Sequence, residues 1–197
     1  AELQIGIQTG SERVNKQVYN RPISNQKVVE VAQAVHRMGI RASYDLIFNN
    51  PYETVEDIKE TIGLLLQFPR PFSLQGYNLI FYPGTDITES ALRDGYIACK
   101  PEMEDFSTIQ GAKDSPTVML GRTEVSGRLY SINYDSRDKE YWNSVVSLFI
   151  LKSVPYAVIR YFARSATGLR KAQLKMFVAL YMWAAGVKNS LRKTNKG

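Results

Sequence analysis

Polar side chains collect after three short apolar stretches of this sequence, where each stretch ends in a turn. Arginine can hold a carboxylate through two parallel hydrogen bonds, and aspartate accepts hydrogen bonds from hydroxyl groups. The set contains no evident acid–base pair and no nucleophile beside a base. Taken alone, it predicts binding of a polar organic ligand with charged and hydrogen-bonding groups. Its members are Gln8, Thr9, Ser11, Glu12, Arg21, Asp45, Asn49, Asn50, Glu53, Tyr82 and Thr85.

Three strands must position these turns. The first segment, LQIGIQTGSE at 3–12, alternates apolar and polar residues before a glycine-containing turn. The other two are YDLIFNNPYET at 44–54 and YNLIFYPGTD at 77–86, and each ends in a turn whose last residue can begin a helix. We expect the second strand to cover 40–48 and the third to cover 72–82.

Helix signals separate the strands. Ser24 is a good N-cap for an amphipathic helix that Gly39 ends, and Thr54 with Asp57 resembles a capping box for a second helix. A short third helix is expected over 87–94. Alternating strands and helices with short connections predict a parallel sheet with right-handed crossovers. In such sheets, ligands bind at the C-terminal ends of the strands, where all three polar turns then lie.

The composition is that of an ordinary globular protein, with 197 residues, 44% hydrophobic and 22% charged, which fits one or two domains. The chain has one cysteine, Cys99, and one histidine, His36. These numbers exclude an internal disulfide framework and a metal site built from several Cys or His ligands. They favour a reducing, cytoplasmic compartment.

The net charge of +6 is unevenly distributed. Residues 141–197 contain ten Lys or Arg and no Asp or Glu, whereas 1–140 hold the other fifteen basic residues and all nineteen acids. The pattern after residue 135 is helical, and 176–187 is uncharged but shorter than the roughly 20 residues that span a bilayer. We expect a buried helix or one that lies in a membrane interface. Such a tail favours an acidic partner: anionic lipid, nucleic acid or another subunit.

Three blocks of the sequence occur in the order and spacing of a known enzyme fold: IGIQTGSERVNKQVYNRPIS, GIRASYDLIFNNPYETVEDIKETI and NLIFYPGTDITESALRDGYI. Residues 3–97 resemble the second half of a radical S-adenosylmethionine (SAM) barrel. The chain looks most like the subgroup that often carries an upstream cobalamin-binding domain, with methylthiotransferases as relatives. The resemblance implies an α/β fold. Residues 1–97 would form a partial (β/α) TIM-like barrel and supply its fourth, fifth and sixth strands. A connecting region, 98–135, and a basic, aromatic helical extension, 136–197, would follow.

The resemblance also implies cofactors and a site. They are SAM, a [4Fe-4S] cluster that cleaves it to a radical, an electron donor protein and, as an open question, cobalamin. The family's C-x3-C-x2-C motif precedes the first block and is absent here. Because the chain begins at Ala1 inside a strand, we interpret it as a fragment that is not active alone. Positions that match the SAM-binding residues of the family are Gln8, Thr9, Ser11, Arg21, Asp45, Ile47, Asn49 and Tyr82.

The expected function is radical-based methyl transfer or rearrangement on an unidentified, lipid-like substrate, with the tail at a membrane surface or over the substrate. The first alternative is a non-catalytic ligand-binding or interaction module derived from the same barrel. The second is an RNA-modifying relative, although the aromatics of the tail look amphipathic-helical and not like a stacking platform, so we do not expect nucleic acid. Structural roles stay open for individual residues: a helix cap for Ser11, a loop cap for Asp45, and a turn anchor for Glu53.

Overall fold

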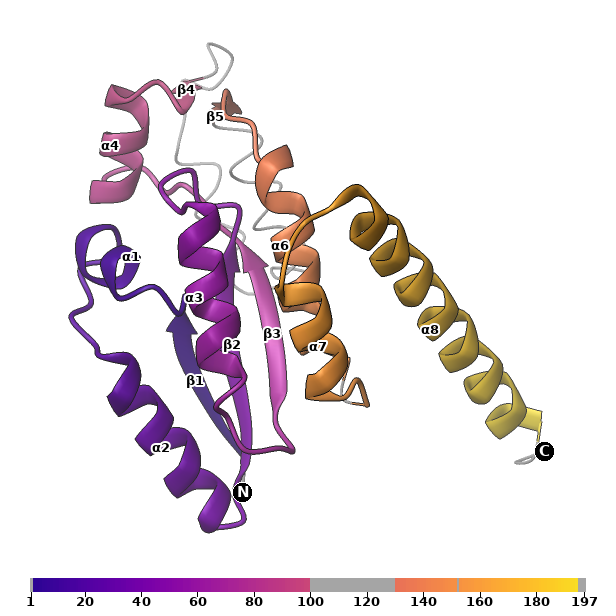
Figure 1. Ribbon diagram of the computed structural model, residues 1–197. Coiled ribbons are helices and arrows are strands. Elements are labelled where there is room, and N and C mark those ends of the chain that lie inside the picture. Colours follow the sequence, from indigo (N-terminus) through magenta and orange to yellow (C-terminus); the bar gives the residue numbers. More distant parts are fainter. Residues whose placement is uncertain (1, 100–129, 152, 195–197) are drawn as a thin grey trace.

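The computed structural model describes residues 2–99, 130–151 and 153–194, with side chains to 184 (Figure 1). Most of the predicted connecting region, 98–135, lies outside the described residues. Strands β1 (Glu2–Gln8), β2 (Arg41–Phe48) and β3 (Ser73–Asn78) form a parallel sheet in that order. The α/β class and the parallel pairing are therefore confirmed. The described strands form an open sheet and not a closed barrel.

Helices α1 (Glu12–Gln17) and α2 (Asn25–Arg37) follow β1, and helix α3 (Val55–Leu65) follows β2. Both predicted N-caps are present, because Ser24 accepts a hydrogen bond from the Lys27 amide and Thr54 forms a complete capping box with Asp57. The left-handed conformation of Gly39, at φ 67°, ends α2 as expected. Helices α2 and α3 lie on the same face of the sheet (Figure 1).

Strand β3 is shorter than the predicted 72–82. The Leu79 amide still donates to the Phe48 carbonyl at 2.8 Å, but the chain then leaves the sheet. Phe81 is fully buried in a second, smaller core beneath α4 (Asp86–Arg93). Strands β4 (Ile97–Cys99) and β5 (Tyr130–Ile132) pair antiparallel over that core. Because Phe81 is buried in this second core, β3 ends earlier than its apolar run predicted.

The C-terminal helices are α6 (Arg137–Ser147), α7 (Tyr156–Ala163) and α8 (Gly168–Thr194). Helix α6 packs against α3, and Trp142 and Val145 belong to the same buried core as the sheet. Helix α8 contributes Leu174 to that core and leans away from the other helices toward its C-terminal end (Figure 1). Among the described residues, no helix is long and apolar enough to cross a membrane.

Candidate functional site

The sheet has one apolar and one polar face. Ile7, Tyr44 and Leu74 belong to the core under the helices, and because side chains alternate along a strand, their neighbours lie on the opposite side. We call this opposite side the polar face. It comprises Gln4, Gly6, Ser43, Asp45, Ile47, Ser73, Gln75 and Tyr77, together with Gln8. The polar face therefore gathers predicted site residues from the first two strands.

Gln8 follows Gln4 and Gly6 on the polar face, and β1 is irregular just before it. The register of β1 against β2 shifts between Gly6 and Gln8, and Gln8 has a φ of 64°. A Cβ on Gly6 would meet Nε2 of Gln8 at 2.7 Å, so the Gln8 side chain folds over the glycine. A positive φ is unfavourable for glutamine, so surrounding contacts must hold this conformation.

Asp45 is the carboxylate at the centre of the polar face. Its Oδ2 accepts a hydrogen bond from Nε2 of Gln4 at 2.7 Å. Its Oδ1 is buried and has no hydrogen-bond partner among the described residues. A buried carboxylate oxygen without a donor is uncommon because its lost hydration is not replaced. The oxygen therefore keeps acceptor capacity that the described residues leave unused.

Other side chains of the polar face bond to one another. Nε2 of Gln75 donates to Oγ of Ser43 at 3.0 Å, and the Tyr77 hydroxyl donates to Oε1 of Gln75 at 2.7 Å. These bonds link β2 to β3 and hold the Gln75 amide in one orientation. The alternation of β2 puts Ile47 on this face as well, where it supplies an apolar surface beside Asp45.

Asn49 lies at the rim of the polar face, directly after β2. Like Gln8, it has a positive φ, here 60°, which asparagine tolerates better than most residues. Its Nδ2 donates to Oδ1 of Asn78 at 2.8 Å, and its carbonyl accepts from the Tyr134 hydroxyl at 2.7 Å. Two neighbouring strands thus end in left-handed turns that are fixed by their surroundings.

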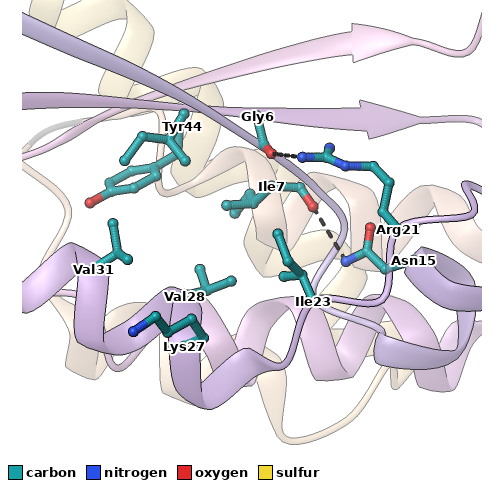
Figure 2. Close-up of a pocket in the computed structure, with 10 residues that line it drawn as sticks. Gly6, Ile7, Asn15, Arg21, Ile23, Lys27, Val28, Val31 and Tyr44 are labelled. Atoms are coloured by element: carbon teal, nitrogen blue, oxygen red, sulfur yellow. Dashed lines mark hydrogen bonds between the residues drawn. The ribbon is translucent and has the colours of Figure 1, made fainter.

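Arg21 lies at the free edge of β1. Its Nη2 donates to the Gly6 carbonyl at 3.1 Å, and Nδ2 of Asn15 donates to the next carbonyl, that of Ile7, at 3.4 Å (Figure 2). The two side chains close one end of a cavity of about 120 Å³ between β1 and α2, with mostly aliphatic walls. A guanidinium group has five N–H donors, so the bond to Gly6 leaves others for a ligand.

Thr9 and Ser11 point to a different place from Gln8. Oγ1 of Thr9 donates to Oε1 of Glu53 at 2.7 Å, and Oγ of Ser11 donates to Oδ1 of Asp57 at 2.5 Å. Both hydroxyl residues are buried, and the Gly10 amide between them donates to Oγ1 of Thr61 at 2.7 Å. We call these five side chains, Thr9, Ser11, Glu53, Asp57 and Thr61, the buried network. It fastens the exit of β1 to α3.

Asp57 is the most heavily bonded member of the buried network. Besides Ser11, it accepts from the amide and hydroxyl of Thr54 at 2.7 Å each and from Nη2 of Arg13 at 2.5 Å. Burial acts to raise the pKa of Asp57, but the hydrogen bonds from Arg13 and Ser11 outweigh it, and the pKa falls to about 2. Asp57 is therefore ionised at neutral pH, and hydrogen bonds within the fold occupy its oxygens.

Glu53 has the opposite electrostatic environment. Burial raises the pKa of its carboxyl to about 7, and the negative charge on Asp57 adds to the effect. The bond from Thr9 and the charges on Lys139 and Arg13 act in the other direction. Lys139 comes from α6, where its buried Nζ donates to the Asn50 carbonyl at 3.2 Å. Sequence analysis did not find Lys139, because no local pattern links α6 to this turn.

Tyr82 lies beyond the end of β3 and is 40% exposed. Its carbonyl accepts from the amide and the hydroxyl of Thr85, so its turn is ordered. The structure thus puts the predicted residues in four places: Gln8, Asp45 and Ile47 on the polar face with Asn49 at its rim, Thr9 and Ser11 in the buried network, Arg21 at the edge of β1, and Tyr82 after β3.

No group of three or more His, Cys, Asp or Glu side chains that could hold a metal ion occurs within the described ranges. Cys99 is exposed on β4. In comparisons with known proteins, no family model matches the chain and no curated protein is significantly similar to it.

Proposed function

We propose that the polar face and the adjoining strand ends bind SAM, as half of a radical SAM (β/α) barrel. The observation that carries this proposal is the buried, unpartnered Oδ1 of Asp45. It lies at the centre of a parallel sheet, on the face opposite the helices and near the C-terminal strand ends. That is where α/β folds place polar ligands. The open edge of β1 is where earlier strands of the barrel would pair.

The available donors and acceptors fit the chemistry of SAM. Its ribose hydroxyls and α-amino group are donors that Asp45 can accept, and its carboxylate can accept from the free N–H groups of Arg21. The Gln8 amide can both donate and accept, and Ile47 offers an apolar contact for the adenine. In this proposal, the chain binds and orients SAM.

The iron–sulfur cluster does not fit the described residues, which contain no suitable set of ligands. When bound near SAM, such a cluster supplies the electron for radical formation. We derive no step through the cluster or through cobalamin from this chain. Methyl transfer or rearrangement on a lipid-like substrate, and reduction by an electron donor protein, are accordingly proposals about a larger assembly.

Calorimetric titration of the chain with SAM and with S-adenosylhomocysteine tests the binding proposal. Asp45→Asn should weaken binding by at least about tenfold, because an amide replaces an ionised acceptor. The matched control is Glu89→Gln on α4, which neutralises an exposed carboxylate far along the chain from the polar face. Equal loss of affinity in both variants, or no binding to the unmodified chain, would overturn the proposal.

A ligand-binding module without radical chemistry is the second candidate, and the unpartnered Oδ1 of Asp45 supports it as well as it supports the enzyme. The two candidates share the polar face and differ in iron content. Iron that copurifies anaerobically with the full-length protein, together with SAM cleavage under reducing conditions, would support the enzyme. SAM binding with neither would support the module.

A further inference from the structure

Helix α8 exposes a line of large apolar side chains. Leu169, Met176, Leu180 and Trp183 follow one another at intervals of seven, four and three residues, which puts them on one side of the helix. Each is exposed to more than half of its surface, from 58% for Leu180 to 70% for Leu169. We call these four side chains the α8 stripe. Exposed apolar residues are common singly, but four that share one side of a helix indicate a binding surface.

The stripe is not the side of α8 that holds the helix to the protein. Leu174 is buried, Phe177 packs against the ring of Phe162, and Tyr181 bonds to the hydroxyl of Ser153. The side chain of Arg170 stacks over the Tyr161 ring of α7 and bonds to Ser165. These contacts fix one side of α8 against α7, and the stripe faces away from them.

The part of the chain that carries the stripe is strongly basic. Residues 141–197 have ten Lys or Arg and no Asp or Glu. On α8 itself, Lys171 and Lys175 are exposed and line a groove toward α6, and Arg160 and Arg164 are exposed on and just after α7. A basic segment that carries an apolar line matches the boundary between anionic headgroups and acyl chains. A phosphate backbone alone would match the cations but leave the apolar line in water.

We propose that the α8 stripe lies in the headgroup region of an anionic lipid bilayer, with the helix parallel to the membrane surface. The leucines and Met176 enter the upper acyl region, and Trp183 lies at the headgroup level that tryptophan prefers. The net positive charge of residues 141–197 attracts the helix to the anionic surface. This inference does not depend on SAM binding by the polar face.

Vesicle flotation of the full chain tests the proposal, with phosphatidylcholine vesicles that contain or lack phosphatidylglycerol. Binding should need the anionic lipid at low salt. Met176→Gln, Leu180→Gln and Trp183→Gln together should reduce partitioning at least about tenfold, since each removes apolar area from the bilayer. The matched control changes three exposed apolar residues elsewhere: Ile23→Gln, Met38→Gln and Ile132→Gln. It should bind like the unmodified chain.

Tryptophan fluorescence gives a readout that needs no destabilising change. The chain has two tryptophans, of which Trp142 is 6% exposed and Trp183 is 69% exposed. Anionic vesicles should shift the emission to shorter wavelength, and brominated lipid should quench it. Trp183→Phe should keep binding and lose the shift.

The proposal is overturned if the emission does not change with vesicles, or if the stripe variant and the control bind equally. It is also overturned if the shift appears without vesicles as protein concentration rises and sedimentation shows a dimer, because a second copy then covers the stripe.

Discussion

The buried network and the polar face lie close to the same strand ends but use their hydrogen-bonding groups differently. In the buried network, the Thr9 and Ser11 hydroxyls and both oxygens of Asp57 all have partners within the protein. On the polar face, Asp45 has a buried oxygen with no partner among the described residues. Both sets come from the same short segments, Thr9 directly following Gln8. The paired groups of the buried network hold the fold, whereas the polar face keeps acceptor capacity that the described residues leave unused.

Removal of Asp57 should have the largest effect on stability. Asp57→Ala leaves the Ser11 and Thr54 donors without their acceptor and Arg13 without its ion pair. We expect the free energy of unfolding to fall by about 3–4 kcal/mol, as for other buried, multiply bonded carboxylates. Urea unfolding would measure it. The control is the neighbouring Glu56, whose side chain is 74% exposed, and Glu56→Ala should change the free energy of unfolding far less than Asp57→Ala.

The pH dependence of stability should separate Glu53 from Asp57. The pKa of Glu53 is raised to about 7 in the fold, so the folded state holds a proton that the unfolded chain has lost. Stability should therefore fall as pH rises from about 4.5 to about 7, by about 2–3 kcal/mol. The pKa of Asp57 is lowered, so the contribution of Asp57 to stability is lost at lower pH, as pH falls from about 4 to about 2.

Glu53→Gln isolates the contribution of Glu53 to the pH dependence of stability. The amide oxygen can still accept from Oγ1 of Thr9, but the group no longer titrates. Urea midpoints at pH 5 and pH 7.5 should differ in the unmodified chain and nearly coincide in the variant. An unchanged difference between the two midpoints would show that the pH dependence comes from another group.

The fold was largely predictable because its signals are local. Ser24, Thr54 and Asp57 cap helices through neighbours three residues away, and Gly39 and Gly95 end helices with positive φ. The predicted end of β3 was wrong by several residues. Phe81 is buried in a core that Tyr130, a residue far along the sequence, completes. Burial against a distant segment leaves no local pattern.

Gly10 tests how tightly the buried network holds the exit of β1. A Cβ there would meet the backbone Cα of Thr61 at 2.4 Å, so Gly10→Ala must push the turn away from α3. We expect a loss of about 2 kcal/mol, typical of overpacking at a rigid contact. Gly63, on the same helix, has open space around its Cβ position, and Gly63→Ala should stabilise by about 0.5–1 kcal/mol. Similar thermal shifts in both variants would contradict the close approach.

The residue types of the site were predictable, but the grouping of its side chains was not. Sequence reasoning grouped Gln8, Thr9 and Ser11 as one set, because all three follow the same strand. Alternation along β1 puts Gln8 on the same face as Gln4 and Gly6, whereas Thr9 and Ser11 bond to Glu53 and Asp57. The register shift after Gly6 and the positive φ of Gln8 then set how the chain leaves the strand. Neither feature has a reliable sequence signal, since glutamine rarely adopts that conformation.

Asp45→Asn should have the smallest effect on stability. Its Oδ2 accepts from Gln4 in an exposed pair, and an asparagine oxygen can keep that bond. The buried Oδ1 has no donor to lose, and a neutral amide is easier to bury than a carboxylate. We therefore expect a change within about 1 kcal/mol, toward greater stability, in urea unfolding. A loss as large as that of Asp57→Ala would mean that Asp45 is paired within the fold, and the distinction between the two clusters would fail. A stable variant with weaker SAM binding would instead separate binding from folding at a single carboxylate.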